Sequence, residues 1–305
     1  MEIRPRLILV PTDFSEPAAH ALRFASRLAE RFGAKVRLLY ADYFVPPVDF
    51  SASAAVEYAL SSDEAADEAK KQLIRVAEEY LPKSVDFDTR VVIDSPIPAI
   101  VDEARSCGAD LLVMGTHGRT GFRRLIVGSV TESVMRIVNV PVIAISPITD
   151  DRRMTATLPR IVCAVDYSDE SREALRYAAS IADPTSRVIV VSNLDTDNAQ
   201  DAADEIVRMQ RWTPPELVER CQYKLLPADH AAEQVVEFAK LVFADVIAVG
   251  SAHDRRTSEV VRGTLAERIA ERADCPVLVV NDIAAMRLAP HPAFGHPLPA
   301  ARGEG

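Results

Sequence analysis

A loop rich in glycine follows one of the most apolar runs of the chain, residues 109–113, which read ADLLV. Four of the chain's eleven glycines lie in this loop: Gly115, Gly118, Gly121 and Gly128. A loop that wraps a polyphosphate must bring backbone N–H groups close to phosphate oxygens, and glycine leaves room for that approach. Three arginines would add positive charge: Arg119, Arg123 and Arg124. The loop therefore indicates an anion site, and a tight strand-to-helix turn is the alternative.

A carboxylate stands at a second predicted strand end. The apolar run 6–11 leads into Asp13 in the order VPTD. In a doubly wound sheet of strand order 3-2-1-4-5, the carboxyl ends of strands 1 and 4 flank a crevice. Asp13 follows strand 1 and Gly115 ends strand 4, so both features would open into the same crevice. The alternative for Asp13 is a local Asx turn with Ser15 or Glu16.

Short β-branched runs alternate with longer amphipathic segments, which is typical of a parallel sheet with helical crossovers. In the first half, strands are predicted at 6–11, 35–41, 86–93, 110–115 and 141–146. Helices are predicted between them at 16–32, 63–80, 96–107 and 129–138. In the second half, strands are predicted at 160–165, 186–192, 218–225, 245–249 and 276–281.

The second half of the chain repeats the first. The segment LILVPTDFSEPAAHALRFASRLA, which begins at Leu7, aligns with RIVCAVDYSDESREALRYAASIA, which begins at Arg160. Asp13 then corresponds to Asp166, and the apolar pattern agrees throughout. Near the ends of the halves, ADLLVMG matches ADVIAVG, and NVPVIAI matches DCPVLVV. Such self-similarity indicates two domains of one fold.

The predicted fold class is α/β, with two doubly wound five-stranded parallel sheets of strand order 3-2-1-4-5 and helices on both faces. The predicted domains are 1–148 and 158–283, and 284–305 is a proline-rich tail without periodicity that we expect to be mobile. Residues 44–62 have no counterpart in the second domain, so they are an inserted loop or short helix. The last strand of each half is an apolar edge strand, which favours pairing of the two domains within the chain as a pseudo-dimer.

The glycine spacing resembles that of a known family. The pattern Gly115-x2-Gly118-x9-Gly128-Ser129, with PTDFS near the start and PVIAI at the end of the half, resembles the universal stress protein family in its tandem two-domain form. Members that bind ATP carry this pattern, so the resemblance implies an ATP-binding first domain with a Rossmann-like fold. Mg²⁺ is compatible with such a site. The resemblance also implies a nucleotide-dependent regulatory role in the stress response.

The resemblance assigns roles to individual residues. Asp13 would hydrogen-bond the ribose hydroxyls, and the main chain at Ala41 would recognise adenine. Glycines and the start of the following helix would surround the phosphates. The complete expected set is Pro11, Thr12, Asp13, Ala41, Met114, Gly115, His117, Gly118, Arg119, Gly128, Ser129 and Val130.

Two of these residues have structural alternatives. Ser129 and Glu132 have the spacing of a capping box, as do Thr264 and Glu267 in the second half. Capping alone would then explain Ser129. His117 either contacts phosphate or is an exposed loop histidine without a partner.

The second half keeps the strand-end glycine and Asp166 but changes the loop. His253 replaces Gly118, and Arg256 replaces Gly121. A side chain at the point of closest phosphate approach would obstruct the loop, so the second domain is predicted to bind ATP weakly or not at all. A different ligand that contacts His253 or His230 is the alternative to a purely structural domain.

Other nucleotide chemistries find little support. No glycine–lysine pair occurs in the chain, which excludes a Walker A motif, and the turn after the first strand lacks GxGxxG. No Ser/His/Asp set or HExxH motif has mechanistic spacing. Binding without designed turnover is therefore the preferred reading. A slow ATPase or phosphoryl-transfer protein acting through Arg123, Arg124 or His117 is one alternative, and an interaction scaffold with a structural nucleotide is another.

Composition limits the partners. The net charge of −10 and the pI near 5.2 argue against nucleic acid or an anionic membrane. No apolar stretch reaches a membrane span, and the first five residues lack a secretion signal, so a cytoplasmic protein is expected. The four scattered cysteines are predicted to be core residues rather than metal ligands. We also expect a homodimer.

Overall fold

The computed structural model describes residues 4–42, 52–117, 127–149, 157–196, 198–251 and 264–281, with the backbone alone for 52–63. The elements of the first half are β1 (Leu7–Pro11), α1 (Glu16–Phe32), β2 (Lys35–Asp42), α2 (Ala52–Tyr80), β3 (Phe87–Ile93), α3 (Pro96–Ser106), β4 (Leu111–Gly115), α4 (Ser129–Ile137) and β5 (Val142–Ile145). Those of the second half are β6 (Arg160–Ala164), α5 (Asp169–Ile181), β7 (Arg187–Asn193), α6 (Ala199–Trp212), the 3₁₀ helix η1 (Pro215–Arg220), β8 (Cys221–Leu226), α7 (Ala231–Leu241), β9 (Val246–Gly250), α8 (Leu265–Arg272) and β10 (Val277–Val280).

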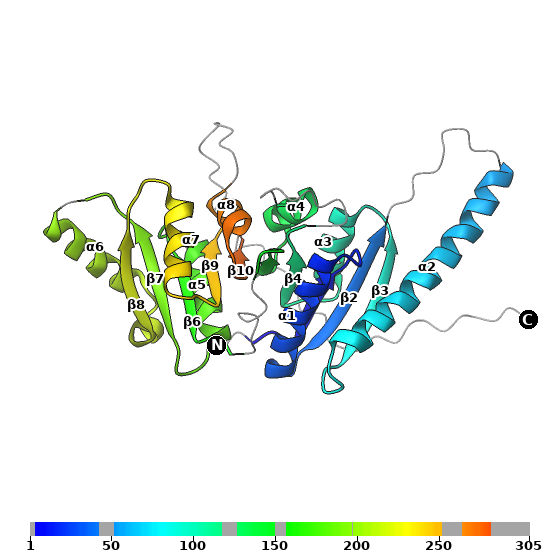
Figure 1. Cartoon of the computed structure of the whole chain (residues 1–305), viewed down its shortest axis with the longest axis horizontal. Helices are drawn as coiled ribbons and strands as arrows, with labels where there is room; N and C mark the ends of the chain where they lie inside the picture. Colours follow the sequence, from blue (N-terminus) through cyan, green and yellow to red (C-terminus); the bar gives the residue numbers. More distant parts are fainter. Residues whose placement is uncertain are drawn as a thin grey trace, which may run out of the picture.

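The strands form one sheet of ten, in the order β3-β2-β1-β4-β5-β10-β9-β6-β7-β8 (Figure 1). Within each half the order is the predicted 3-2-1-4-5 and all pairings are parallel. The two predicted five-stranded units are joined edge to edge into this single sheet. The apolar edges β5 and β10 pair antiparallel, with Leu278 opposite Ile143, and so each covers the other's unpaired backbone groups. This pairing within the chain confirms the predicted pseudo-dimer.

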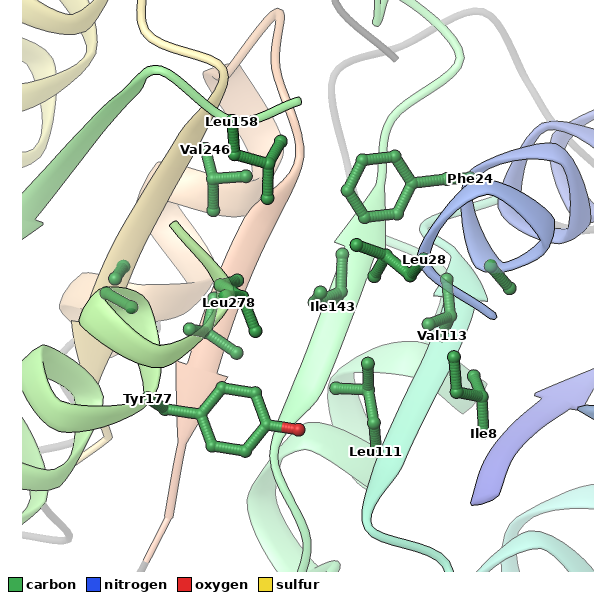
Figure 2. Packing of buried hydrophobic residues seen from close by; sticks show 14 of the residues in the cluster. Ile8, Phe24, Leu28, Leu111, Val113, Ile143, Leu158, Tyr177, Val246 and Leu278 are labelled. Atoms are coloured by element: carbon green, nitrogen blue, oxygen red, sulfur yellow. The ribbon is translucent and has the colours of Figure 1, made fainter. Parts of the chain in front are cut away.

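Apolar side chains cover both faces of this sheet. One cluster contains buried residues of α1, α2, α5 and α6, and the other contains buried residues of α3, α4, α7 and α8. Each cluster runs through both halves, so the sheet and its helices share a continuous core. Figure 2 shows the junction, where Ile143 and Leu278 lie side by side and the Tyr177 hydroxyl points towards the first half. That hydroxyl donates to the Asp110 carbonyl at 3.2 Å, and burial raises the pKa of Tyr177, which keeps the donor proton in place.

Polar contacts also join the halves. At the end of α1, Arg31 donates to the carbonyls of Ile181 and Ala182 at 2.8 and 3.0 Å and pairs with Asp183 at 2.9 Å. On the other face, the buried Asn281 amide donates to the carbonyls of Met135 and Val138 at 2.5 and 2.9 Å. The last carbonyls of a helix lack partners inside it, so both contacts satisfy groups that would otherwise be left unpaired.

The surplus of the first half lengthens a helix. Residues 52–62 belong to α2, which has 29 residues, whereas its counterpart α6 has 14. The predicted helix start at 63 was therefore too late, and Figure 1 shows α2 extending past the edge of the sheet. Residues 43–51 and the predicted tail 284–305 lie outside the described residues.

Candidate functional site

A cavity of about 280 Å³ opens where the carboxyl ends of β1 and β4 diverge, at the reversal of winding in the first half. This is the crevice in which doubly wound sheets place ligands. Its lining residues are Pro11, Thr12, Asp13, Ala18, Leu39, Ala41, Pro96, Ile100, Met114, Gly115, His117, Gly128, Ser129, Val130 and Thr131.

The cavity gathers ten of the twelve expected site residues, and the other two, Gly118 and Arg119, lie outside the described residues. Five lining residues were not expected: Ala18, Leu39, Pro96, Ile100 and Thr131. Leu39 could have been found, because it lies two residues before Ala41 and strand side chains two apart share a face. Pro96 and Ile100 depend on how α3 packs on the sheet, and the sequence gives no direct signal of that.

Asp13 forms the Asx turn that was the alternative reading. Its Oδ1 accepts hydrogen bonds from the backbone N–H of Ser15 at 3.0 Å and from the Ser15 hydroxyl. Between them, Phe14 has a φ of +63°, an uncommon value for a residue with a side chain. The second half repeats this turn at Asp166, where Tyr167 has a φ of +66°. The turn therefore belongs to the fold, and in the first half it fixes a carboxylate on the cavity wall.

Gly115 is required by packing. A Cβ built on Gly115 would lie 2.8 Å from the Pro17 carbonyl oxygen at the start of α1. A Cβ on Gly250 would lie 2.4 Å from the Ser171 amide nitrogen of α5. The close approach of helix to strand thus explains this glycine in both halves without reference to phosphate.

Helix α4 begins one residue earlier than its capping motif suggests. Its N-cap is Gly128, which makes no side-chain hydrogen bond, so the predicted Ser129 capping box does not form. Glu132 instead pairs with Arg136 at 2.7 Å. In the second half, Thr264 and Glu267 do form the predicted box. The same motif thus gives different caps, because the backbone enters α4 through a glycine that cannot cap by a side chain.

The first turn of α4 faces the cavity. Ser129, Val130 and Thr131 all line it, and no side chain caps this helix end. Backbone N–H groups of a first turn lack partners within the helix, and together with the helix dipole they favour an anion. The Thr131 hydroxyl donates to the Gly115 carbonyl at 2.7 Å, which ties the helix to the end of β4.

His117 is half-buried, and its ring has a hydrogen-bond partner. The expectation of an exposed loop histidine without a partner was therefore wrong. The His117 Nδ1 lies 2.9 Å from the hydroxyl of the buried Thr116. The Thr116 carbonyl also accepts from the Gly128 N–H at 2.6 Å. Thr116 therefore joins the two ends of the segment 118–126, which lies outside the described residues.

Apolar side chains form much of the remaining cavity lining. Leu39 and Ala41 of β2, Ile100 of α3 and Met114 of β4 supply this surface, and Pro96 stands at the start of α3. Along the strand order β2-β1-β4, the lining passes from apolar residues of β2 to Asp13 after β1 and then to the first turn of α4 after β4. A ligand with a flat apolar part, a polar middle and an anionic end matches this order.

Two further features are absent from the described residues. None of their helices combines the length and apolar character that crossing a membrane requires. Within the same ranges, no three His, Cys, Asp or Glu side chains gather as metal ligands would.

Comparison with known proteins places the chain in a family. The sequence profile of the universal stress protein family matches residues 5–146 and again residues 157–281. The chain therefore belongs to the universal stress protein family, as a tandem two-domain member.

Two relatives from one organism each match a little under half of this chain. The universal stress protein MJ0531 of Methanocaldococcus jannaschii is 35% identical over 141 residues, which cover 45% of this chain and 80% of that protein. The universal stress protein MJ0577 of the same organism is 29% identical over 157 residues, covering 48% of this chain and 97% of that protein. The solved structure of a universal stress protein from Archaeoglobus fulgidus covers 90% of this chain and 98% of its own, with a TM-score of 0.68 and 18% identity, and so shares the fold.

Proposed function

We propose that the first half binds an adenine nucleotide, ATP, in the cavity between β1 and β4, and that the second half does not. The supporting observation is convergence: the ten described residues expected at such a site, drawn from separate parts of the sequence, all line one cavity. Its volume of about 280 Å³ is close to the lower end of small-ligand sites.

Each part of the nucleotide has a matching wall. Leu39, Ala41 and Ile100 offer apolar surface to the base, and the backbone at Ala41 offers hydrogen-bonding groups. Asp13 offers a charged acceptor to the ribose hydroxyls. The phosphates would lie at the first turn of α4, where Gly128 leaves the N-terminus uncovered by a side chain.

Regulation is a better account than turnover. Asp13, the carboxylate among the described residues that line the cavity, is held in an Asx turn by Ser15 rather than set up as a base. A regulatory protein needs two conformations that differ in affinity for the ligand. Helix α4 offers a route for such a difference, because its first turn lines the cavity and its last turn is bonded to Asn281 of the second half.

Titration calorimetry with ATP on protein freed of bound nucleotide tests this function. We expect one site per chain. The Asp13→Asn variant keeps an oxygen acceptor for the Asx turn but loses the charge, so its ATP affinity should fall about tenfold, the equivalent of one charge-assisted hydrogen bond. Asp166→Asn is the matched control in the equivalent turn and should leave the affinity unchanged.

Three results would contradict the proposal: no ATP binding, two equal sites per chain, or equal effects of the two variants. Regulation is tested separately, by the change that saturating ATP causes in the melting temperature and in self-association. Release of inorganic phosphate at a steady rate, abolished by Asp13→Asn, would favour the slow ATPase instead.

A further inference from the structure

A network of ion pairs lies between the sheet and α3 in the first half. Arg37 of β2 donates to both oxygens of Asp88 on β3, at 2.6 and 2.8 Å, and to Glu103 of α3 at 2.8 Å. Lys35 also pairs with Asp88 at 2.6 Å. Glu103 is 8% exposed, and its charge is compensated by Arg37 at 2.8 Å and by Arg90 of β3 at 3.8 Å.

This network adjoins two walls of the cavity. Side chains two apart on a strand share a face, so Arg37 lies on the same face as Leu39 and Ala41, which line the cavity. Glu103 lies three residues after Ile100, another lining residue, and positions three apart are neighbours on a helix surface. The contact between Arg37 and Glu103 therefore lies next to the surface that we assign to the base, and it joins β2 directly to α3.

The second half shows the same packing without charges. Ile189 of β7 occupies the place of Arg37, because Arg37 pairs with Leu9 of β1 and Ile189 pairs with the equivalent Val162 of β6. Gln222 of β8 occupies the place of Asp88, because each lies opposite that residue on the next strand.

The helix position is equivalent as well. The carbonyl of Glu103 accepts from the residue that ends α3, and the carbonyl of Phe238 accepts from the residue that ends α7. Ile189 and Phe238 both pack against the apolar cluster on this face. The fold therefore forms with apolar residues at these two positions, and the second half has no charged side chain at the places of Arg37, Asp88 and Glu103.

Stability does not explain this difference. Replacing a buried ion pair with apolar residues of similar volume is often neutral or stabilising, because desolvation offsets the attraction between the charges. What the network does supply is a fixed geometry: two hydrogen bonds to Asp88 orient the Arg37 guanidinium on the sheet, and a third joins it to Glu103 of α3. That geometry matters only where the space beside it is used, and only the first half is proposed to use it.

We propose that Arg37 and Glu103 are positioning residues that hold α3 at the distance from β2 that an adenine base requires. The inference rests on the proposed nucleotide binding and adds the origin of its base selectivity. Neither side chain lines the cavity, so both act through Leu39, Ala41 and Ile100.

The test replaces the three charged residues of the first half with the residues at the equivalent positions of the second half. The triple variant Arg37→Ile, Asp88→Gln and Glu103→Phe places at these positions the residues that already pack there in the same chain. Kd for ATP and for GTP is measured by titration calorimetry, with the urea midpoint as a measure of folding. We expect an unchanged midpoint, a loss of ATP affinity of about tenfold, and a fall in the preference for ATP over GTP, because a supporting shell sets the geometry of the contacts in front of it.

The matched control is Ile189→Val with Phe238→Leu, which should alter neither Kd. If the triple variant does not fold, Glu103→Gln keeps the shape of the side chain and should show the same shift in preference to a smaller extent. Unchanged ATP affinity in a folded variant would overturn the inference, as would equal losses for ATP and GTP, which indicate general loosening. Absence of ATP binding by the unmodified chain would instead overturn the proposed function, and the inference with it.

Discussion

Arg136 of α4 donates to both carboxylate oxygens of Glu267 of α8, from Nε to Oε1 at 2.6 Å and from Nη2 to Oε2 at 3.0 Å. Glu267 also accepts from the Thr264 N–H at 2.9 Å, which caps α8. A single buried carboxylate thus caps a helix of the second half and binds the helix whose first turn lines the cavity of the first. Figure 1 shows α4 and α8 side by side above the β5–β10 junction.

Replacing Arg136 with Met should destabilise the chain. Glu267 is 4% exposed, so it would keep its charge with one partner fewer. We expect a loss of about 1–2 kcal/mol in the free energy of unfolding, at the low end for charged hydrogen bonds because the Arg136 side chain is 44% exposed. Urea unfolding measures it. Lys240→Met removes an exposed pair with Glu237 and is the control, and an equal effect of the two variants would argue against a special role for Arg136.

The strand-end glycines give a prediction that is independent of nucleotide. Gly115→Ala and Gly250→Ala should each cost about 1–3 kcal/mol, because the added methyl group would overlap the backbone of α1 or α5. Gly33→Ala is the control for backbone conformation without overlap, because a Cβ at Gly33 would meet open space. The positive φ of +67° alone should lower the free energy of unfolding by about 1 kcal/mol in this variant. Thermal unfolding without ligand measures all three. A neutral Gly250→Ala would show that the helices can shift.

The stability contributed by Asp88 should depend on pH. Burial alone would raise the pKa of Asp88, but hydrogen bonds from Arg37 and Lys35 outweigh it and lower the pKa. A carboxyl whose pKa is lowered by folding stabilises the protein above its unfolded pKa of about 3.9, and this contribution is lost as the pH falls through the folded pKa. The difference in unfolding free energy between the unmodified chain and Asp88→Asn should therefore be constant from neutral pH to about 5 and shrink below about 4. A difference that grows on acidification would contradict the lowered pKa.

Phe243 adopts a left-handed backbone conformation, and the equivalent residue of the first half, Gly108, is a glycine. It follows α7 with a φ of +54° and is 65% exposed, whereas Gly108 follows α3 with a φ of +67°. Phe243→Gly should raise the free energy of unfolding by about 0.5–1 kcal/mol by removing this strain. Gly108→Ala is the reciprocal change and should lower it by about 1 kcal/mol. Destabilisation by Phe243→Gly would mean that contacts of the ring outweigh the strain.

Local sequence patterns predicted where residues lie better than they predicted the structural role of each residue. The glycine at 115 was read as room for phosphate, yet Gly250 needs the same space to pack against α5. The capping motif at Ser129 and that at Thr264 look alike in sequence, but only the second forms a box. Such motifs specify which bonds are available, and the path of the backbone into the helix selects among them.

By itself, the sequence determined the alternation of strands and helices, the strand order of each half, the internal repeat and most of the cavity lining. These follow from periodicities and residue types that act over a few neighbouring positions. Only the tertiary structure decided that the expected pairing of the two halves is antiparallel, with Leu278 of β10 opposite Ile143 of β5. It also decided that α3 supplies a wall of the cavity, and that Arg37 and Glu103 meet between β2 and α3. Those contacts join residues distant in the chain, and they depend on how whole surfaces fit together, which no local pattern records.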